Sequence, residues 1–150
     1  MNYTESERKR LLNAAAEVVL ATVTADRTGV VAYFREMTAA GRYLYDAGQR
    51  YAHNQLVQEL MAGTAQPEAA DTAPGDRQPL PRQQLLERIS EVGEIVKDDE
   101  EGREFKEFLY GLAENIARAS GSLFTSRISM DEREFLEELR TRLRLPEGAA

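Results

Sequence analysis

Clustered aspartate and glutamate side chains are the residues of this chain whose type and spacing could bind a metal ion. Four form an unbroken run after residue 97, and two more lie where a later helix is expected to begin. Hard divalent cations take several carboxylate oxygens as ligands, so the two groups predict a metal site if the fold brings them together. These candidate metal ligands are Asp98, Asp99, Glu100, Glu101, Asp131 and Glu134.

The acidic run has a second interpretation that needs no metal. A helix is expected directly after Glu101, and carboxylates at a helix start complement the helix dipole and accept hydrogen bonds from its free amides. The run does not match an EF-hand loop, because the central glycine and the closing glutamate do not fall at the required positions. We therefore expect the run to stabilise a helix start, with cation binding as the alternative.

His53 is the single histidine, and it lies close to Tyr43, Tyr45 and Tyr51. These side chains could line a small pocket, or they could place their rings against the core and their polar tips in water. The chain has no phosphate-cradling glycine loop, dinucleotide fingerprint, nucleophile elbow or zinc-binding histidine pair, and it has no cysteine. The sequence therefore predicts a protein that is not an enzyme and has no cofactor, although paired carboxylates could catalyse without a local motif.

The composition indicates one folded domain spanning residues 1–150. Hydrophobic residues make up 42% of the chain and charged residues 30%, which is enough to bury a core. No stretch approaches the roughly 20 apolar residues that span a bilayer, and no signal-peptide pattern is present, so we expect a cytoplasmic protein. The formal net charge of −7 argues against nucleic acid or an anionic membrane as a partner.

Apolar residues recur at helical spacing, which predicts an all-α, single-domain bundle of about six helices. The Pro- and Gly-rich segment 62–79 is expected to be a flexible linker or loop that joins two three-helix halves. Gly41, within the second helix, could allow another helix to approach closely. The expected helices cover approximately residues 6–24, 30–47, 51–61, 81–97, 102–119 and 130–145.

Two helix starts carry the sequence signature of a capping box, Thr4 with Glu7 and Ser129 with Glu132. In this motif each side chain accepts a hydrogen bond from a backbone amide that the first turn leaves unpaired. The β-branched residues from Val18 to Thr24 would also permit a strand. We favour a helix there, because the segment lacks the alternation of a strand.

The segment from Asn115 to Leu143 has a helix that ends in small residues, then a loop, then Ile-Ser and an acidic capping box. It resembles the helical hairpin of the tellurite-resistance TerB-like superfamily and small bacterial all-helical proteins with the same C-terminal plan. The resemblance implies an all-α bundle, and some members of the superfamily carry acidic clusters linked to metal binding. Ser120, Gly121 and Ser122 replace the usual Asp-Gly between the helices, so no metal ligand is transferred from the family.

Two functions follow as hypotheses. The first is a non-enzymatic helical module that acts by association with itself, most simply as a homodimer, or with another protein. The second is a stress-related module that binds a divalent cation or a small ligand through the acidic residues. The absence of a clustered nucleophile, base and orienting group favours the first.

Overall fold

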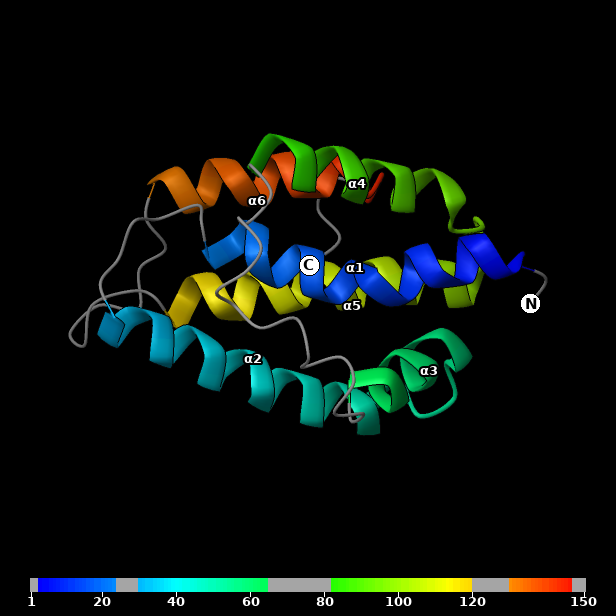
Figure 1. Cartoon of the computed structure of the whole chain (residues 1–150), viewed down its shortest axis with the longest axis horizontal. Helices are drawn as coiled ribbons and strands as arrows, with labels where there is room; N and C mark the ends of the chain where they lie inside the picture. The colour runs from blue at the N-terminus through cyan, green and yellow to red at the C-terminus, as the bar shows by residue number, and fades with distance from the viewer. Residues whose placement is uncertain (1–2, 24–29, 65–81, 120–129, 147–150) are drawn as a thin grey trace.

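The computed structural model describes residues 3–23, 30–64, 82–119 and 130–146. Within these ranges the chain forms six α-helices and no strand, which confirms the predicted all-α bundle. Figure 1 shows the helices stacked side by side in three layers. Their bounds are α1 Glu5–Val23, α2 Val30–Arg50, α3 Gln55–Thr64, α4 Arg82–Ile95, α5 Glu100–Ala119 and α6 Met130–Arg142.

The middle layer pairs α1 with α5, whereas one outer layer holds α4 and α6 and the other holds α2 and α3 (Figure 1). α1 packs along α4 and α5, and α2 packs along α5, so the most extensive contacts join the first three helices to the last three. α5 is the central element, because it contacts α1, α2, α3 and α6. Its apolar face is the most regular in the chain, and Phe105, Phe108 and Leu112 on that face are fully buried in the one core cluster that the described residues form.

The third helix differs from its prediction at both ends. The third helix begins at Gln55 and not near Tyr51, because residues 51–53 form a turn and Asn54 caps the helix through its Oδ1, 3.1 Å from the amide nitrogen of Val57. That helix runs to Thr64, into the segment predicted as a loop, and residues 65–81 lie outside the described ranges. The stretch from Val18 to Val23 is helical, so the strand alternative is wrong.

The first capping box is confirmed. The amide of Thr4 donates to Glu7 Oε2 at 2.7 Å, and the amide of Glu7 donates to Thr4 Oγ1 at 3.1 Å. Two amides that the first turn of α1 would leave unpaired are therefore satisfied. Ser129, the capping residue of the second predicted box, lies outside the described residues.

Glycine allows two close approaches between helices, although not at the predicted position. Gly41 is exposed, and no described atom lies within 4 Å of where its Cβ would stand, so the prediction of a close helix there is wrong. On α4, a Cβ at Gly93 would collide with the carbonyl oxygen of Arg142 at the end of α6. On α5, a Cβ at Gly111 would collide with the phenol of Tyr43. These glycines let α6 and α2 pack closely against their neighbours.

Candidate functional site

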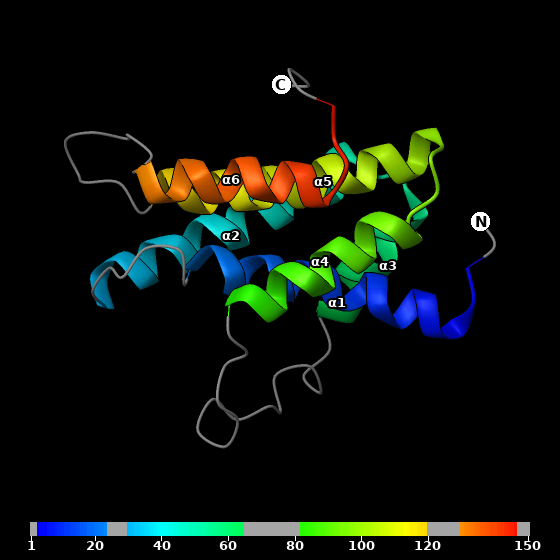
Figure 2. The same ribbon diagram turned by 90° about the horizontal axis from the view of Figure 1, so that it is seen from above.

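The structure separates the two groups of predicted metal ligands. Asp98, Asp99, Glu100 and Glu101 lie at the start of α5, whereas Asp131 and Glu134 lie in the first turns of α6. The start of α6 is at the opposite end of the bundle from the start of α5 in both views (Figures 1 and 2). Across the described residues, no group of three or more histidine, aspartate or glutamate side chains is arranged to hold a metal ion.

Two members of the acidic run act at helix ends. Asp99 Oδ1 accepts a hydrogen bond from the amide of Gly102 at 2.7 Å, which makes Asp99 the N-cap of α5. Glu101 reaches across to α3, where its Oε1 accepts from the amides of Gln55 at 2.6 Å and Leu56 at 3.3 Å. These contacts support the helix-end interpretation for both side chains. They also tie the start of α3 to the start of α5.

Asn54 and His53 complete this junction between α3 and α5. The fully buried Asn54 donates through Nδ2 to the carbonyl oxygen of Glu101 at 2.9 Å and to Glu104 Oε2 at 3.1 Å. His53 is exposed, and its Nε2 lies 2.9 Å from Glu104 Oε1. His53 therefore contacts Glu104 at this junction and forms an ion pair with it when protonated. It lies in a shallow hollow with Asp99, Glu100 and Glu101, which none of the three tyrosines lines.

The His53–Glu104 contact predicts a measurable titration. The hydrogen bond and charge of Glu104 raise the pKa of His53 above its ordinary value of 6.5, and the hydrogen bond from His53 lowers the pKa of Glu104. The stabilisation from protonated His53 is complete below pH 6.5 and is lost as the pH rises through the raised pKa. Because the chain has one histidine, an NMR titration should give one imidazole signal, and Glu104→Gln should return its pKa towards 6.5. An unchanged pKa in that variant would contradict the contact.

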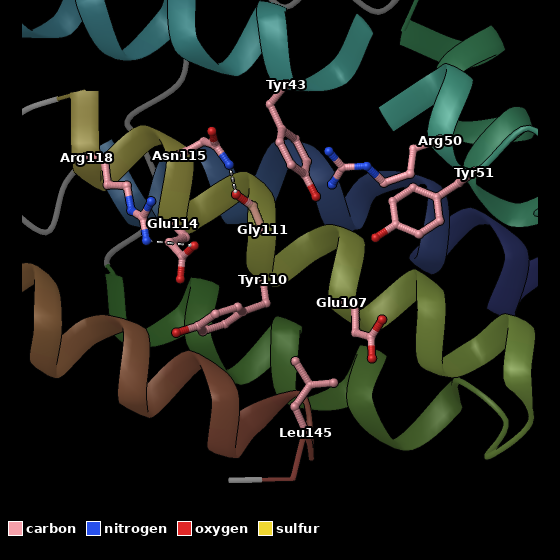
Figure 3. A pocket seen from close by; sticks show the side chains of 10 residues that line it. All are labelled: Tyr43, Arg50, Tyr51, Glu107, Tyr110, Gly111, Glu114, Asn115, Arg118 and Leu145. Atoms are coloured by element: carbon pink, nitrogen blue, oxygen red, sulfur yellow. Dashed lines mark hydrogen bonds and ion pairs between the residues drawn. The ribbon is translucent and has the colours of Figure 1, made fainter. Parts of the chain in front are cut away.

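A groove on the opposite side of the core from α1 is the second candidate site (Figure 3). It has a volume of about 360 Å³ and follows the solvent-facing side of α5, with α2 on one side and α6 on the other. We refer to its α5 residues as the α5 stripe: Glu107, Tyr110, Gly111, Glu114, Asn115 and Arg118. The remaining lining residues are Tyr43, Arg50, Tyr51 and Leu145.

Tyrosines from α2 and the turn after it build one wall of the groove. Tyr43 lies across α5 at Gly111, donates from its hydroxyl to the carbonyl oxygen of Phe108 at 2.9 Å, and stacks on the Phe108 ring with centroids 5.8 Å apart. Tyr51 meets the same ring edge-on at 6.2 Å. Burial raises the pKa of both tyrosines, so both phenols stay protonated at neutral pH. Tyr45, by contrast, is 69% exposed and does not line the groove.

The opposite wall is fixed by α6. The Arg140 guanidinium lies 4.8 Å from the centroid of the Tyr110 ring and donates to the Tyr110 hydroxyl at 3.0 Å. Further along α5, Arg118 pairs with Glu114 one turn earlier at 3.4 Å. The groove thus has rigid aromatic walls and charges of both signs, a composition that suits polar contact with another surface more than burial of an apolar ligand.

The groove was not predicted, although part of its signal is in the sequence. The other stripe residues lie three, four, seven, eight and eleven positions after Glu107, a helical spacing that places them on the face of α5 opposite its apolar face. Such a pattern predicts only that the stripe faces away from the core. That α2 and α6 stand on either side of it depends on the packing order of the helices, which periodicity does not contain.

These features define an all-α bundle with an aromatic, mixed-charge groove on its central helix. No known family model, curated protein or solved structure matches the chain. The resemblance to the TerB-like superfamily therefore stays a prediction. In the described part of the chain, no helix is both long and apolar enough to cross a membrane.

Proposed function

We propose that this protein is a non-enzymatic helical module that works by binding a protein chain through the groove along the α5 stripe. The observation that carries the proposal is the composition of the groove, where three tyrosines and two arginines line one continuous surface. Tyrosine and arginine are enriched at protein interfaces, because each offers a large contact area together with hydrogen-bonding groups.

The construction of the groove supports the same function. Tyr43 and Tyr110 are held by hydrogen bonds to α5 and from α6, so they lose little conformational freedom when a partner binds. Asn115 and Arg118 project into solvent at the far end of the stripe, where they can reach a partner's polar groups. Rigid aromatic walls with adaptable polar groups are typical of surfaces that recognise another protein.

Site-specific photo-crosslinking tests this proposal. A photoreactive amino acid at Asn115 is expected to give covalent protein adducts in cells of the source organism, because Asn115 is exposed within the groove. Gln84 is the matched control, since it is an exposed amide residue on α4 that does not line the groove. Adducts from position 84 equal to those from position 115, or none from 115, would contradict a binding role for the groove.

Cation binding at the start of α5 is the second candidate function. The observation in its favour is that the hollow there gathers His53, Glu104 and three residues of the acidic run. Asp99 and Glu101 already accept hydrogen bonds from helix amides, which leaves fewer carboxylate oxygens for an ion. A rise in melting temperature with excess Ca²⁺, Mg²⁺, Mn²⁺ or Zn²⁺ would favour this candidate.

A further inference from the structure

A hollow of about 420 Å³ lies where the end of α4 meets the second turn of α5 and the residues that follow α6. Three of its lining residues are cations, Lys97, Lys106 and Arg144, and two are carboxylates, Glu94 and Asp98. We infer that this hollow binds a phosphate group, as free phosphate or as part of a small metabolite, between Lys106 and Arg144. The inference is independent of the groove along the α5 stripe, with which the hollow shares no described lining residue.

Lys106 is the residue that carries the inference. It is only 7% exposed, and lysine is almost never buried to this degree without a partner. Its ammonium nevertheless makes no hydrogen bond or ion pair within the described part of the chain. The ammonium also keeps some contact with solvent, because the only fully sealed side-chain atoms without a hydrogen bond among the described residues belong to Arg8 and Glu17. The buried side chain therefore presents its charge where a ligand in the hollow can reach it.

The electrostatic surroundings of Lys106 favour a bound anion. Burial lowers the pKa of Lys106, and the positive charge of Arg144 acts in the same direction. The negative charge of Asp98 acts against both, but Asp98 is exposed and forms no ion pair with the ammonium among the described contacts. An anion bound between Lys106 and Arg144 would offset the burial of one cation and its repulsion by the other, because a nearby negative charge stabilises a protonated amine.

Arg144 supplies the second cation from a backbone conformation that favours glycine. Its φ is 58°, in the left-handed region, at the position where glycine commonly ends a helix. The guanidinium pairs with Glu94 at 3.4 Å, and the two side chains are 62% and 64% exposed, so the pair is weak and a ligand can displace it. Attraction to the C-terminal dipole of α6 accounts for a cation at this position, but not for the buried Lys106 on α5.

A phosphate group suits the chemistry of these two side chains. Arginine donates paired N–H bonds to phosphate oxygens, and lysine adds a compact positive charge. A phosphate dianion balances both cations, whereas a carboxylate balances only one. Lys97 is not assigned to the ligand, because its ammonium lies over the Tyr3 ring, 5.3 Å from the centroid. The volume of the hollow is in the range of small-molecule sites, so it has room for a group attached to the phosphate.

Thermal melting of the purified full-length protein at constant ionic strength tests this site. Inorganic phosphate and glycerol 3-phosphate are the probes, and chloride and acetate are the control anions. Each probe is expected to raise the melting temperature by several degrees in a saturable manner, because a ligand of the folded state stabilises it. The probe that binds more tightly tells whether the ligand is free phosphate or a phosphorylated small molecule.

Two variants that are expected to fold locate the site. Lys106→Met replaces a buried charge with an apolar side chain, and Arg144→Gly suits the left-handed backbone. Each should raise the phosphate concentration needed for half of the effect at least about tenfold, because each removes a charged hydrogen-bond donor. Lys9→Met is the matched control, since Lys9 is an exposed lysine on α1 that does not line the hollow, and it should respond as the unaltered protein does.

The response to phosphate distinguishes a binding role of Lys106 from a structural one. A structural lysine would change the melting temperature without phosphate and leave the response to phosphate intact. An undiminished response in Lys106→Met would therefore overturn the inference. So would the absence of a saturable response to both probes, or a response to acetate equal to that to phosphate.

Discussion

Replacing Gly93 with alanine is expected to destabilise the fold by about 2–3 kcal/mol, because the new methyl group would overpack the contact between α4 and α6. The added Cβ would meet the carbonyl oxygen of Arg142 and would lie 3.3 Å from the Cα of Leu143. Both are backbone atoms, which cannot move aside as a flexible side chain can. Relief therefore requires the end of α6 to shift away from α4, and the buried Leu143 would move with it.

Gly41→Ala is the matched control for this prediction. Gly41 also lies inside a helix, yet it is exposed and no described atom lies within 4 Å of the added Cβ. Alanine there should stabilise the protein by up to about 1 kcal/mol, because alanine has the higher helix propensity. Urea unfolding followed by circular dichroism gives both values. Similar changes in the two variants would show that helix propensity governs both positions, which would contradict the close packing at Gly93.

The six helices could be predicted because each buries a stripe of apolar residues, and the period of that stripe is written in the sequence. The Phe105, Phe108 and Leu112 face of α5 is an example, and all three side chains are fully buried. The start of α3 was misplaced, since the apolar pattern continues through Tyr51 while the hydrogen bonds of Asn54 begin the helix later. Asparagine is a common N-cap, but the sequence offers several polar residues near each boundary.

The sites were harder to predict than the helices, because they depend on which helix ends meet. Asp98 to Glu101 and Glu134 were grouped by chemical type, and the order of the helices places them at opposite ends of the bundle. The contact of Glu101 with the start of α3 joins residues almost fifty positions apart, and no local pattern encodes it. Glu104, which holds both His53 and Asn54, was not singled out for the same reason.

Asn54→Ala should be the second large effect, with an expected loss of about 2–4 kcal/mol in the free energy of unfolding. Asn54 is fully buried, and its side chain makes three hydrogen bonds, to the amide of Val57, the carbonyl of Glu101 and the carboxylate of Glu104. Alanine removes the N-cap of α3. The Val57 amide, the Glu101 carbonyl and the Glu104 carboxylate would each lose their hydrogen bond to Asn54 at a partly or fully buried position. Removing one partner of a buried hydrogen bond costs more than the bond itself contributes.

Two further substitutions separate the contribution of the α3 N-cap from that of the hydrogen bonds that Asn54 donates to α5. Asn54→Asp keeps an oxygen that accepts from the amide of Val57, but it removes the donor and sets a carboxylate against Glu104, so it should remain clearly destabilised. Asn115→Ala is the matched asparagine control, because Asn115 is exposed and, among the described residues, its side chain bonds only the Gly111 carbonyl one turn earlier on its own helix. The unfolding free energy of this variant should change by less than about 0.5 kcal/mol. Chemical unfolding of the three variants gives the comparison. Full stability in Asn54→Asp would mean that the cap alone matters and that the donor from Asn54 to α5 contributes nothing to joining the two helix starts.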